Sequence, residues 1–264
     1  LANDCMRPKG LEVNHLGVQH TDWGYHGGRK LSQHGNLGGV GFHVMDDPEL
    51  APQYFEMVRE IVERYQNDER IIIWNVYNEI GNSKRGELSR PHLQKILEIV
   101  RGIDPIQPVT CETWSLQKGG LDSIPAIERY ALEQSDIISY HSYGDYITNV
   151  KIIKTLQSFG RPIMVTEWLA RGCRNTVQEL FPLFYLEKIG AYNWGFVAGK
   201  YQTYEPWNNV WENYEKDPHF DYDFTKWFHD LYRPNHRPYD PKEIEIIRYF
   251  CDLADKDFAE TQKQ

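Results

Sequence analysis

The sequence predicts an α/β fold, specifically a (β/α)8 TIM barrel of which part of the first half is missing. From residue 50 onward, short apolar and β-branched runs alternate with amphipathic stretches of helical period. The expected strands begin about every 30 residues, which is the length of one βα unit. No GxGxxG motif follows any of them, which removes the main support for an open nucleotide-binding sheet.

The expected elements are five strands, each preceded by a helix. The strands are expected at 71–77, 108–113, 136–141, 162–166 and 191–197. The helices are expected at 49–66, 87–103, 124–133, 147–159 and 177–189, and a last helix at 242–253 closes the chain. The aromatic-rich segment 199–223 is expected to be a loop that shapes a substrate cleft.

The first 49 residues fit this pattern poorly, because they are rich in Gly and His and show no helical period. Residues 1–4 are expected to be the tail of a strand. On that count, residues 1–264 form a single, partial barrel domain that lacks the first two βα units and most of strand three. Segments 11–18 and 40–45 are weaker candidates for substitute strands.

Composition narrows the classes of partner. The formal net charge is -9 at pH 7, so neither nucleic acid nor an anionic membrane would meet a basic surface. No apolar run is long enough to span a membrane. The four cysteines are widely spaced and are expected to be buried free thiols. The sequence shows no signal peptide at Leu1 and leaves the cellular compartment and the oligomeric state open.

Two glutamates stand where catalytic groups are found in parallel barrels, at the carboxyl ends of strands. Glu79 follows the strand at 71–77, and Glu167 follows the strand at 162–166. If the polar face of the strand at 71–77 looks toward the barrel axis, side-chain alternation turns Glu79 into the mouth of the barrel, and the same alternation applies to Glu167. Asn78 would then need a local bulge to join Glu79. Glycoside hydrolysis needs two such carboxyl groups flanking one bond.

The motifs around these glutamates resemble those of the clan A retaining glycoside hydrolases, which include families 2 and 5. The segment NDERIIIWNVYNE at 67–79 resembles the strand-four motif of the clan, and PIMVTEW at 162–168 resembles its strand-seven motif. The resemblance implies that Glu79 is the general acid/base, that Asn78 binds the sugar 2-hydroxyl, and that Glu167 is the nucleophile. It also implies a retaining separation of roughly 5–5.5 Å between the carboxyl groups and a raised pKa for Glu79.

The other expected site residues are aromatic or imidazole side chains. By resemblance, His141 and Tyr143 belong to the strand-six motif, in which Tyr143 orients the nucleophile, and Trp194 is the strand-eight Trp under the cleaved sugar. Trp168 and Trp114 are candidate sugar platforms, because flat rings stack on the apolar faces of sugars. Trp23 and Trp207 are further candidates for that role. No cofactor and no metal is expected.

Two alternatives stay open at this point. One is a carbohydrate-binding barrel, or an inactive fragment, that does not catalyse. The other is a metal-dependent sugar isomerase or epimerase, because carboxylate and imidazole groups at successive strand ends suit Mn²⁺ or Mg²⁺. Among β-linked carbohydrates, gluco-, manno-, galacto- and xylo-configured substrates all remain.

Overall fold

The structure, a computed structural model, describes residues 1–5, 40, 42–199, 202–217 and 219–263. These residues form two compact units. Unit 1 contains 1–5, 40, 42–141 and 154–163, and unit 2 contains 142–153 together with the described residues from 164 onward. The candidate strand at 11–18 and Trp23 lie outside the described residues.

The sheet of unit 1 is parallel. Its strands β1 (Ala2–Asn3), β2 (Trp74–Asn78) and β3 (Val109–Cys111) are hydrogen-bonded in the order β1-β2-β3. A parallel bridge between Thr113 and Tyr140 continues the pairing to β4 (Ile138–His141). A strand is therefore present within 1–4, as β1, and the strands predicted near 71, 108 and 136 are confirmed.

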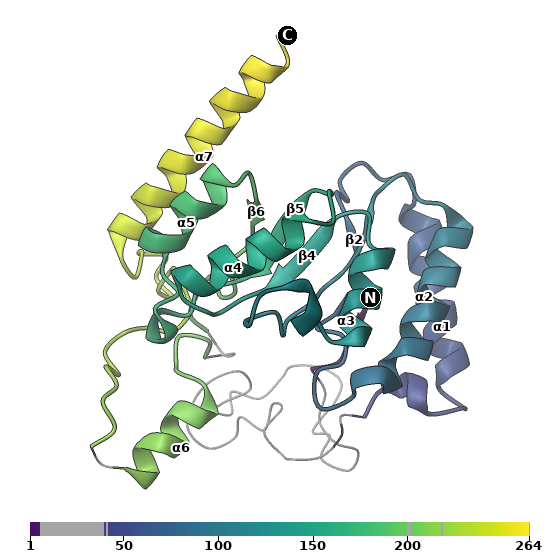
Figure 1. Ribbon diagram of the computed structural model, residues 1–264, viewed down its shortest axis with the longest axis horizontal. Helices are drawn as coiled ribbons and strands as arrows, with labels where there is room; N and C mark the ends of the chain where they lie inside the picture. The colour runs from purple at the N-terminus through teal and green to yellow at the C-terminus, as the bar shows by residue number, and fades with distance from the viewer. Residues whose placement is uncertain (6–39, 41, 200–201, 218, 264) are drawn as a thin grey trace. The chain divides into compact units, whose positions relative to one another are not determined.

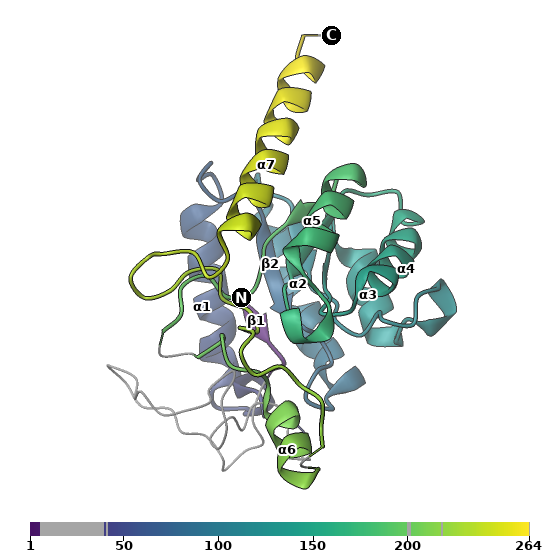
Figure 2. The ribbon, with the colours of Figure 1, turned by 90° about the vertical axis from the view of Figure 1, so that its left-hand side faces the viewer.

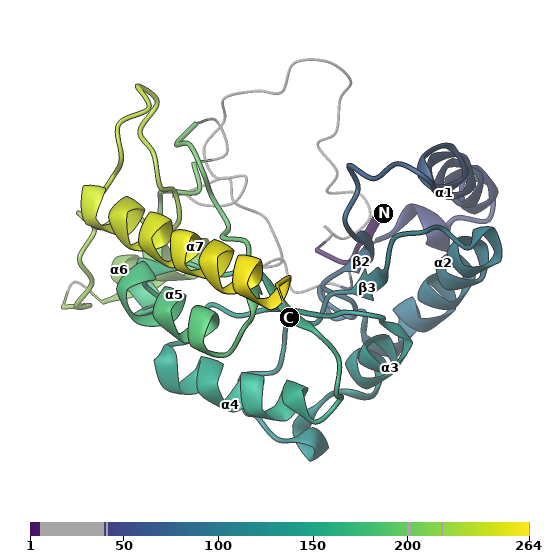
Figure 3. The same cartoon turned by 90° about the horizontal axis from the view of Figure 1, so that it is seen from above.

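Three helices cover this sheet. They are α1 (Ala51–Tyr65), α2 (Arg90–Ile103) and α3 (Ala126–Gln134), and α1 packs alongside α2 (Figure 3). Short 3-10 turns η1 (Val44–Asp46), η2 (Gly86–Ser89) and η3 (Leu121–Ser123) lie between the main elements. The alternative strand at 40–45 is wrong, because η1 occupies the end of that segment and its described residues form no strand.

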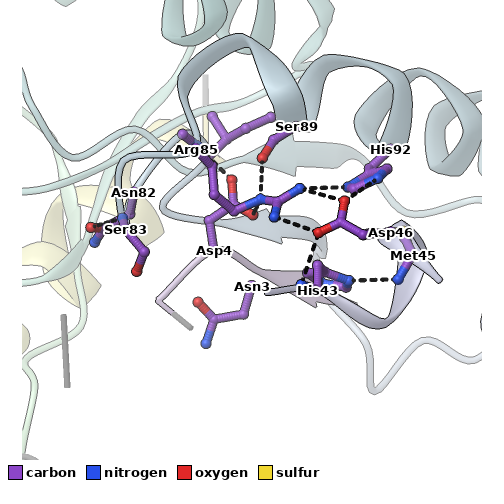
Figure 4. A network of polar contacts seen from close by, with 12 residues as sticks. Asn3, Asp4, His43, Met45, Asp46, Asn82, Ser83, Arg85, Ser89 and His92 are labelled. Carbon is purple, nitrogen blue, oxygen red and sulfur yellow. Dashed lines mark hydrogen bonds and ion pairs between the residues drawn. The ribbon is translucent and has the colours of Figure 1, made fainter. Parts of the chain in front are cut away.

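A buried group of charged side chains ties β1 to α2 and its preceding turn (Figure 4). The guanidinium of Arg85 is 1% exposed, and its Nε lies 3.1 Å from the fully buried Asp4 carboxylate. The same guanidinium donates to both carboxylate oxygens of Asp46, at 2.7 and 2.9 Å. Ser89 accepts from Nε, and His92 Nε2 lies 3.2 Å from Asp46. Each charge of the group therefore has an opposite charge or a polar partner, as burial requires.

Unit 2 is built around a short parallel pair and three helices. Strand β5 (Ile163–Glu167) pairs with β6 (Gly190–Ala191), so that Met164 lies opposite Gly190. Its helices are α5 (Val177–Leu186), α6 (Asn208–Lys216) and α7 (Pro241–Thr261), with a 3-10 turn η4 (Arg171–Cys173). Helix α7 packs on α5 and extends beyond it (Figures 1 and 2). The chain reaches β5 from β4 through α4 (Tyr146–Gln157).

The predicted helices correspond to α1 to α5 and α7, with shifts at their ends. Helix α7 is longer than the predicted 242–253, and α6 lies in the segment predicted as loop. All four cysteines are free thiols as predicted, but only Cys111 is buried, and Cys251 is exposed. No helix among the described residues has both the length and the apolar character that a membrane crossing requires.

Candidate active site

Backbone hydrogen bonds hold the ends of β2, β3 and β4 in register within unit 1. The Glu112 amide donates to the Tyr77 carbonyl at 2.9 Å, and the Ile80 amide donates to the Glu112 carbonyl at 3.3 Å. On the other side, the His141 amide donates to the Thr113 carbonyl at 2.7 Å. These main-chain contacts therefore fix the backbone of the three strand ends relative to one another.

Glu79 stands at the first of these strand ends and is 9% exposed. Its backbone has a φ of 48°, in the left-handed region that non-glycine residues rarely adopt. Oxygen Oε1 lies 2.7 Å from His141 Nδ1. Oxygen Oε2 accepts from Cys5 Sγ and from Asn82 Nδ2, both at 2.5 Å. Three polar hydrogen-bonding partners therefore surround one buried carboxylate.

These contacts shift the pKa of the Glu79 carboxyl. Burial raises the pKa of this carboxyl, but the hydrogen bond and charge of His141 outweigh it, with help from Cys5 and Asn82. The net result is a pKa well below the ordinary value for glutamate. This is opposite to the raised pKa expected from the sequence, because the sequence did not show how many donors face the carboxylate.

Two further carboxylates lie near Glu79 in unit 1. Glu112 Oε2 lies 3.2 Å from His141 Nε2, and both side chains are almost fully buried. Glu128 accepts from the backbone amides of Trp114 and Ser115 at 3.0 and 3.2 Å. Burial raises the pKa of Glu128. The half-buried Trp114 ring donates from Nε1 to a backbone carbonyl at 3.2 Å, so one edge of this candidate platform is fixed.

The bulge expected beside Asn78 lies elsewhere in β2. The register of β2 against β3 shifts between Asn75 and Tyr77, so a bulge is present, two residues earlier than the Asn78–Glu79 step where it was expected. The Asn78 amide donates to Asn3 Oδ1 at 3.1 Å, which ties it to β1. The strict alternation from 73 to 79 therefore does not hold, and Glu79 reaches its place through its unusual backbone conformation.

Glu167, in unit 2, has a different setting. The Tyr143 hydroxyl donates to Glu167 Oε2 at 2.6 Å, and the Ser142 amide donates to the Glu167 carbonyl at 3.0 Å. The Tyr143 ring packs edge-on against Trp207 and His229, with centroids 5.0 and 5.3 Å apart. Glu167 is half-buried at the end of β5, so its carboxylate is both held and accessible.

Trp168 and Trp194, two of the predicted sugar-binding tryptophans, differ in their surroundings within unit 2. Trp194 is half-buried, and its amide donates to the Trp168 carbonyl at 3.0 Å. Trp168 is 1% exposed and packs between Phe181 and Phe184. The prediction of Trp168 as a sugar platform is therefore wrong: the residue after the strand-end glutamate turns into the core of unit 2, where its ring has no free face.

Several residues of these clusters escaped the sequence reasoning. Neither Cys5 nor Asn82 was predicted as a site residue, and Cys5 lies 74 positions from the carboxylate that it contacts. His229 lies in the tail of the chain, and its Nδ1 lies 2.5 Å from the Leu169 carbonyl. Glu112 did carry a signal, since it lies near the end of the strand predicted at 108–113, but its contact with His141 was not predicted.

With the geometry established, the chain can be compared with known proteins. The Cellulase family, described as glycosyl hydrolase family 5, matches residues 43–200, which is more than half of the chain. The chain belongs to glycosyl hydrolase family 5. That membership confirms the resemblance to clan A seen in the strand-end motifs, and it leaves the isomerase alternative without support.

Solved structures share the fold of this family 5 chain. A β-galacturonidase of family 2 from Eisenbergiella tayi, bound to galacturonate, has a TM-score of 0.51 at 17% identity, over 78% of this chain and 38% of that one. Xylanase 10B from Thermotoga petrophila, in complex with xylobiose, has a TM-score of 0.50 at 16% identity, over 78% of this chain and 67% of that one. These likenesses place the fold among the clan A (β/α)8 barrels, of which the described residues contain six strands.

Proposed function

We propose that this family 5 chain is a retaining glycoside hydrolase that cleaves β-glycosidic bonds in β-linked oligo- or polysaccharides. The observation that carries the proposal is the hydrogen bond from the Tyr143 hydroxyl to Glu167 Oε2, at 2.6 Å. A hydroxyl donor on this half-buried carboxylate orients the group toward its reaction, which is what a nucleophile needs. Family membership and the strand-end position of Glu79 support its assignment as the second catalytic carboxyl group.

In the proposed mechanism, Glu167 attacks the anomeric carbon while Glu79 protonates the departing glycosidic oxygen. The glycosyl enzyme is then released when Glu79 takes a proton from the attacking water. Tyr143 orients Glu167 in both steps. Asn78 would bind the sugar 2-hydroxyl, and Trp194 would stack on the sugar at the cleaved bond. Trp114 is proposed as a platform for a neighbouring sugar.

An activated aryl β-glycoside tests the roles of the two glutamates. Glu167→Gln should lower kcat by roughly 10⁴-fold or more, because no nucleophile replaces the carboxylate. Glu79→Ala should lose activity that azide restores with formation of a glycosyl azide. Glu98→Gln is a control, because that side chain is 70% exposed in an exposed ion pair on α2. Full activity of Glu167→Gln would remove it from the mechanism.

The stereochemical outcome tests the retaining proposal separately. Proton NMR of the first product of a β-glycoside should show the β-anomer, and a first-formed α-anomer would contradict a double displacement. Binding of a β-linked oligosaccharide without turnover, with both glutamates intact, would instead support a carbohydrate-binding barrel. The structures of clan A barrels with xylobiose and galacturonate make β-xylans and uronic-acid glycans sensible first substrates to screen.

A further inference from the structure

The side-chain amide of Asn175 joins two segments of unit 2. Asn175 is fully buried, and its Oδ1 accepts from the Leu169 amide at 2.7 Å, just beyond the end of β5. Its Nδ2 donates to the carbonyls of Ser142 and Gly144, at 3.0 and 2.5 Å. These are the residues directly before and after Tyr143 in the chain. One buried amide therefore connects the end of β5 to both neighbours of Tyr143.

The partners of the Asn175 side chain fix which way its amide points. A backbone amide can only donate and a carbonyl can only accept, so Oδ1 must face Leu169 and Nδ2 must face the two carbonyls. An asparagine side chain offers two N–H donors and one carbonyl oxygen, and both donors and the oxygen are bonded here. An aspartate at this position would lack the two amide donors, and a leucine would lack all three groups.

The main chain places Asn175 beside the end of β5. An antiparallel bridge pairs Ala170 with Asn175 through two backbone hydrogen bonds, at 3.0 and 3.3 Å, and closes the turn η4. Leu169 has a φ of 80°, in the left-handed region that a residue with a side chain rarely adopts. Such a conformation persists only where surrounding contacts enforce it. The bond from the Leu169 amide to Asn175 is one of these contacts.

The loop that carries the tyrosine is attached to β5 through both main chain and side chain. The Ser142 amide donates to the Glu167 carbonyl at 3.0 Å, and the Ser142 carbonyl accepts from Asn175. Asn149 also donates to the Gly144 carbonyl, at 2.8 Å, but it lies on α4 and so ties the loop to its own helix. The Asn175 amide ties the same loop to the strand end of the proposed nucleophile.

We propose that Asn175 is a positioning residue for the nucleophile and acts through Tyr143. The inference rests on the proposed function, because it describes how the direction of the Glu167 carboxylate is set. The Tyr143 hydroxyl donates to Glu167 Oε2 at 2.6 Å, and a hydrogen bond weakens steeply when its angle is distorted. Because Asn175 holds the residues on both sides of Tyr143, it keeps this hydroxyl aligned with the carboxylate without touching the substrate.

Gln107, in unit 1, is a matched control for the loss of a buried amide. It is 5% exposed, and its side chain makes hydrogen bonds of the same kinds as Asn175. Its Nε2 donates to the carbonyls of Tyr65 and Asp68, at 3.2 and 2.8 Å, and its Oε1 accepts from Trp74 Nε1 at 2.9 Å. Gln107 precedes β3 and so lies at the opposite end of that strand from the carboxyl end. Its loss should therefore affect stability and not the nucleophile.

The first test compares kcat and KM on an aryl β-glycoside. Asn175→Leu keeps the shape of the side chain and removes its hydrogen bonds, so kcat should fall by about 10-fold while KM changes by less than about two-fold. Gln107→Met should lower the urea midpoint to a similar extent, with kcat within about two-fold of the unmodified chain. An unchanged kcat in Asn175→Leu would overturn the proposal, and so would an equal loss of kcat in Gln107→Met.

A double-mutant cycle tests whether Asn175 acts through Tyr143. In a Tyr143→Phe background, Asn175→Leu should lower kcat by no more than about two-fold, because the hydroxyl that Asn175 positions is already absent. A purely structural role would instead give two effects that multiply in full. That result would overturn the inference, since Asn175 would then act by another route.

The last test needs no catalysis and so separates this inference from the proposed function. The full chain is labelled with fluorotyrosine, and the Tyr143 signal in fluorine NMR is assigned by its loss in Tyr143→Phe. In Asn175→Leu this signal should move by more than its linewidth, and in Gln107→Met it should stay in place. If Asn175→Leu does not fold, Asn175→Asp should also move the signal, because it keeps the acceptor for Leu169 and loses the amide donors.

The outcomes of this NMR test are distinct. A Tyr143 signal that stays in place in the folded Asn175 variant would overturn the inference, whether or not any glycoside is hydrolysed. A signal that moves equally in Gln107→Met would also overturn it, because the change would then reflect lost stability. If the unmodified chain hydrolyses no aryl β-glycoside but the Tyr143 signal responds as stated, the proposed function alone fails.

Discussion

Replacing Arg85 with methionine should be among the most destabilising single changes in unit 1. The Arg85 Nε lies 3.1 Å from Asp4, whose side chain is fully buried. Two unit charges at that distance interact by about 5 kcal/mol at an effective dielectric constant of about 20. Removing only the cation leaves Asp4 buried and uncompensated, and such losses cost about 3–5 kcal/mol. Asp46, at 35% exposure, can recover water and adds little to that cost.

The pH dependence gives the Arg85→Met prediction its signature. Burial already raises the pKa of Asp4, and the cation partly offsets that effect. Without Arg85, the folded chain should bind a proton at Asp4 that the unfolded chain releases above about pH 4. A folded pKa above the unfolded one means that stability is lost as pH rises. The penalty should therefore be small near pH 4 and grow toward pH 7, by at most about 1.4 kcal/mol for each pH unit.

Urea unfolding followed by circular dichroism at pH 4.5 and 7 measures this penalty. The matched control is Arg101→Met, because Arg101 also forms a bidentate pair, with Asp136, but both side chains are more than 40% exposed. That change should cost about 1 kcal/mol or less. A penalty below about 1 kcal/mol for Arg85→Met at pH 7, or one that does not depend on pH, would refute the reasoning.

Three further changes have expected outcomes. Tyr143→Phe should lower kcat by about 10- to 100-fold, because the hydrogen bond to Glu167 is lost, while the urea midpoint stays nearly unchanged. A kcat equal to that of the unmodified chain would show that Tyr143 plays no orienting role. Trp168→Ala should cost about 3–5 kcal/mol of stability with little change in KM, and a large rise in KM in a fully stable variant would instead return Trp168 to the sugar site. Burial lowers the pKa of His43 from 6.5 to about 4, so the free energy of unfolding should fall by about 3 kcal/mol as pH drops from 6.5 to 4. His43→Asn should make that fall smaller, and an unchanged dependence on pH in the variant would contradict the role of His43.

The strands and most helices followed from the sequence because each has a clear local signal. Strand β5, for example, is a short β-branched run after Pro162, and α2 combines a proline in its first turn with a regular apolar face. Element ends were less predictable, since Gly190–Ala191 pairs over only two residues where seven were expected. Helix α6 was missed because its aromatic side chains are equally typical of a loop over a cleft.

The hydrogen-bond partners of the two glutamates could be predicted only where both residues belonged to a recognised motif. The contact between Tyr143 and Glu167 was expected from two motifs, and the hydrogen bond is present. The Cys5 and Glu112 contacts arise from strand order in space, which brings together residues that are far apart in sequence. Trp168 was misplaced because a strand-end aromatic ring can face either the cleft or the core, and neighbouring residues in the sequence do not decide between them.

The segment Asp4–Cys5, directly after β1, contacts both the buried charges around Arg85 and the side chain of Glu79. Asp4 accepts from the Gly81 amide at 2.6 Å, and Cys5, the next residue, donates to Glu79. Asp4 therefore anchors the turn after β2 while its neighbour contacts the carboxylate that precedes that turn. A left-handed backbone at Glu79 costs about 1–3 kcal/mol and persists only where surrounding contacts enforce it. The Asp4–Arg85 pair supplies such contacts, so damage to it should lower activity as well as stability.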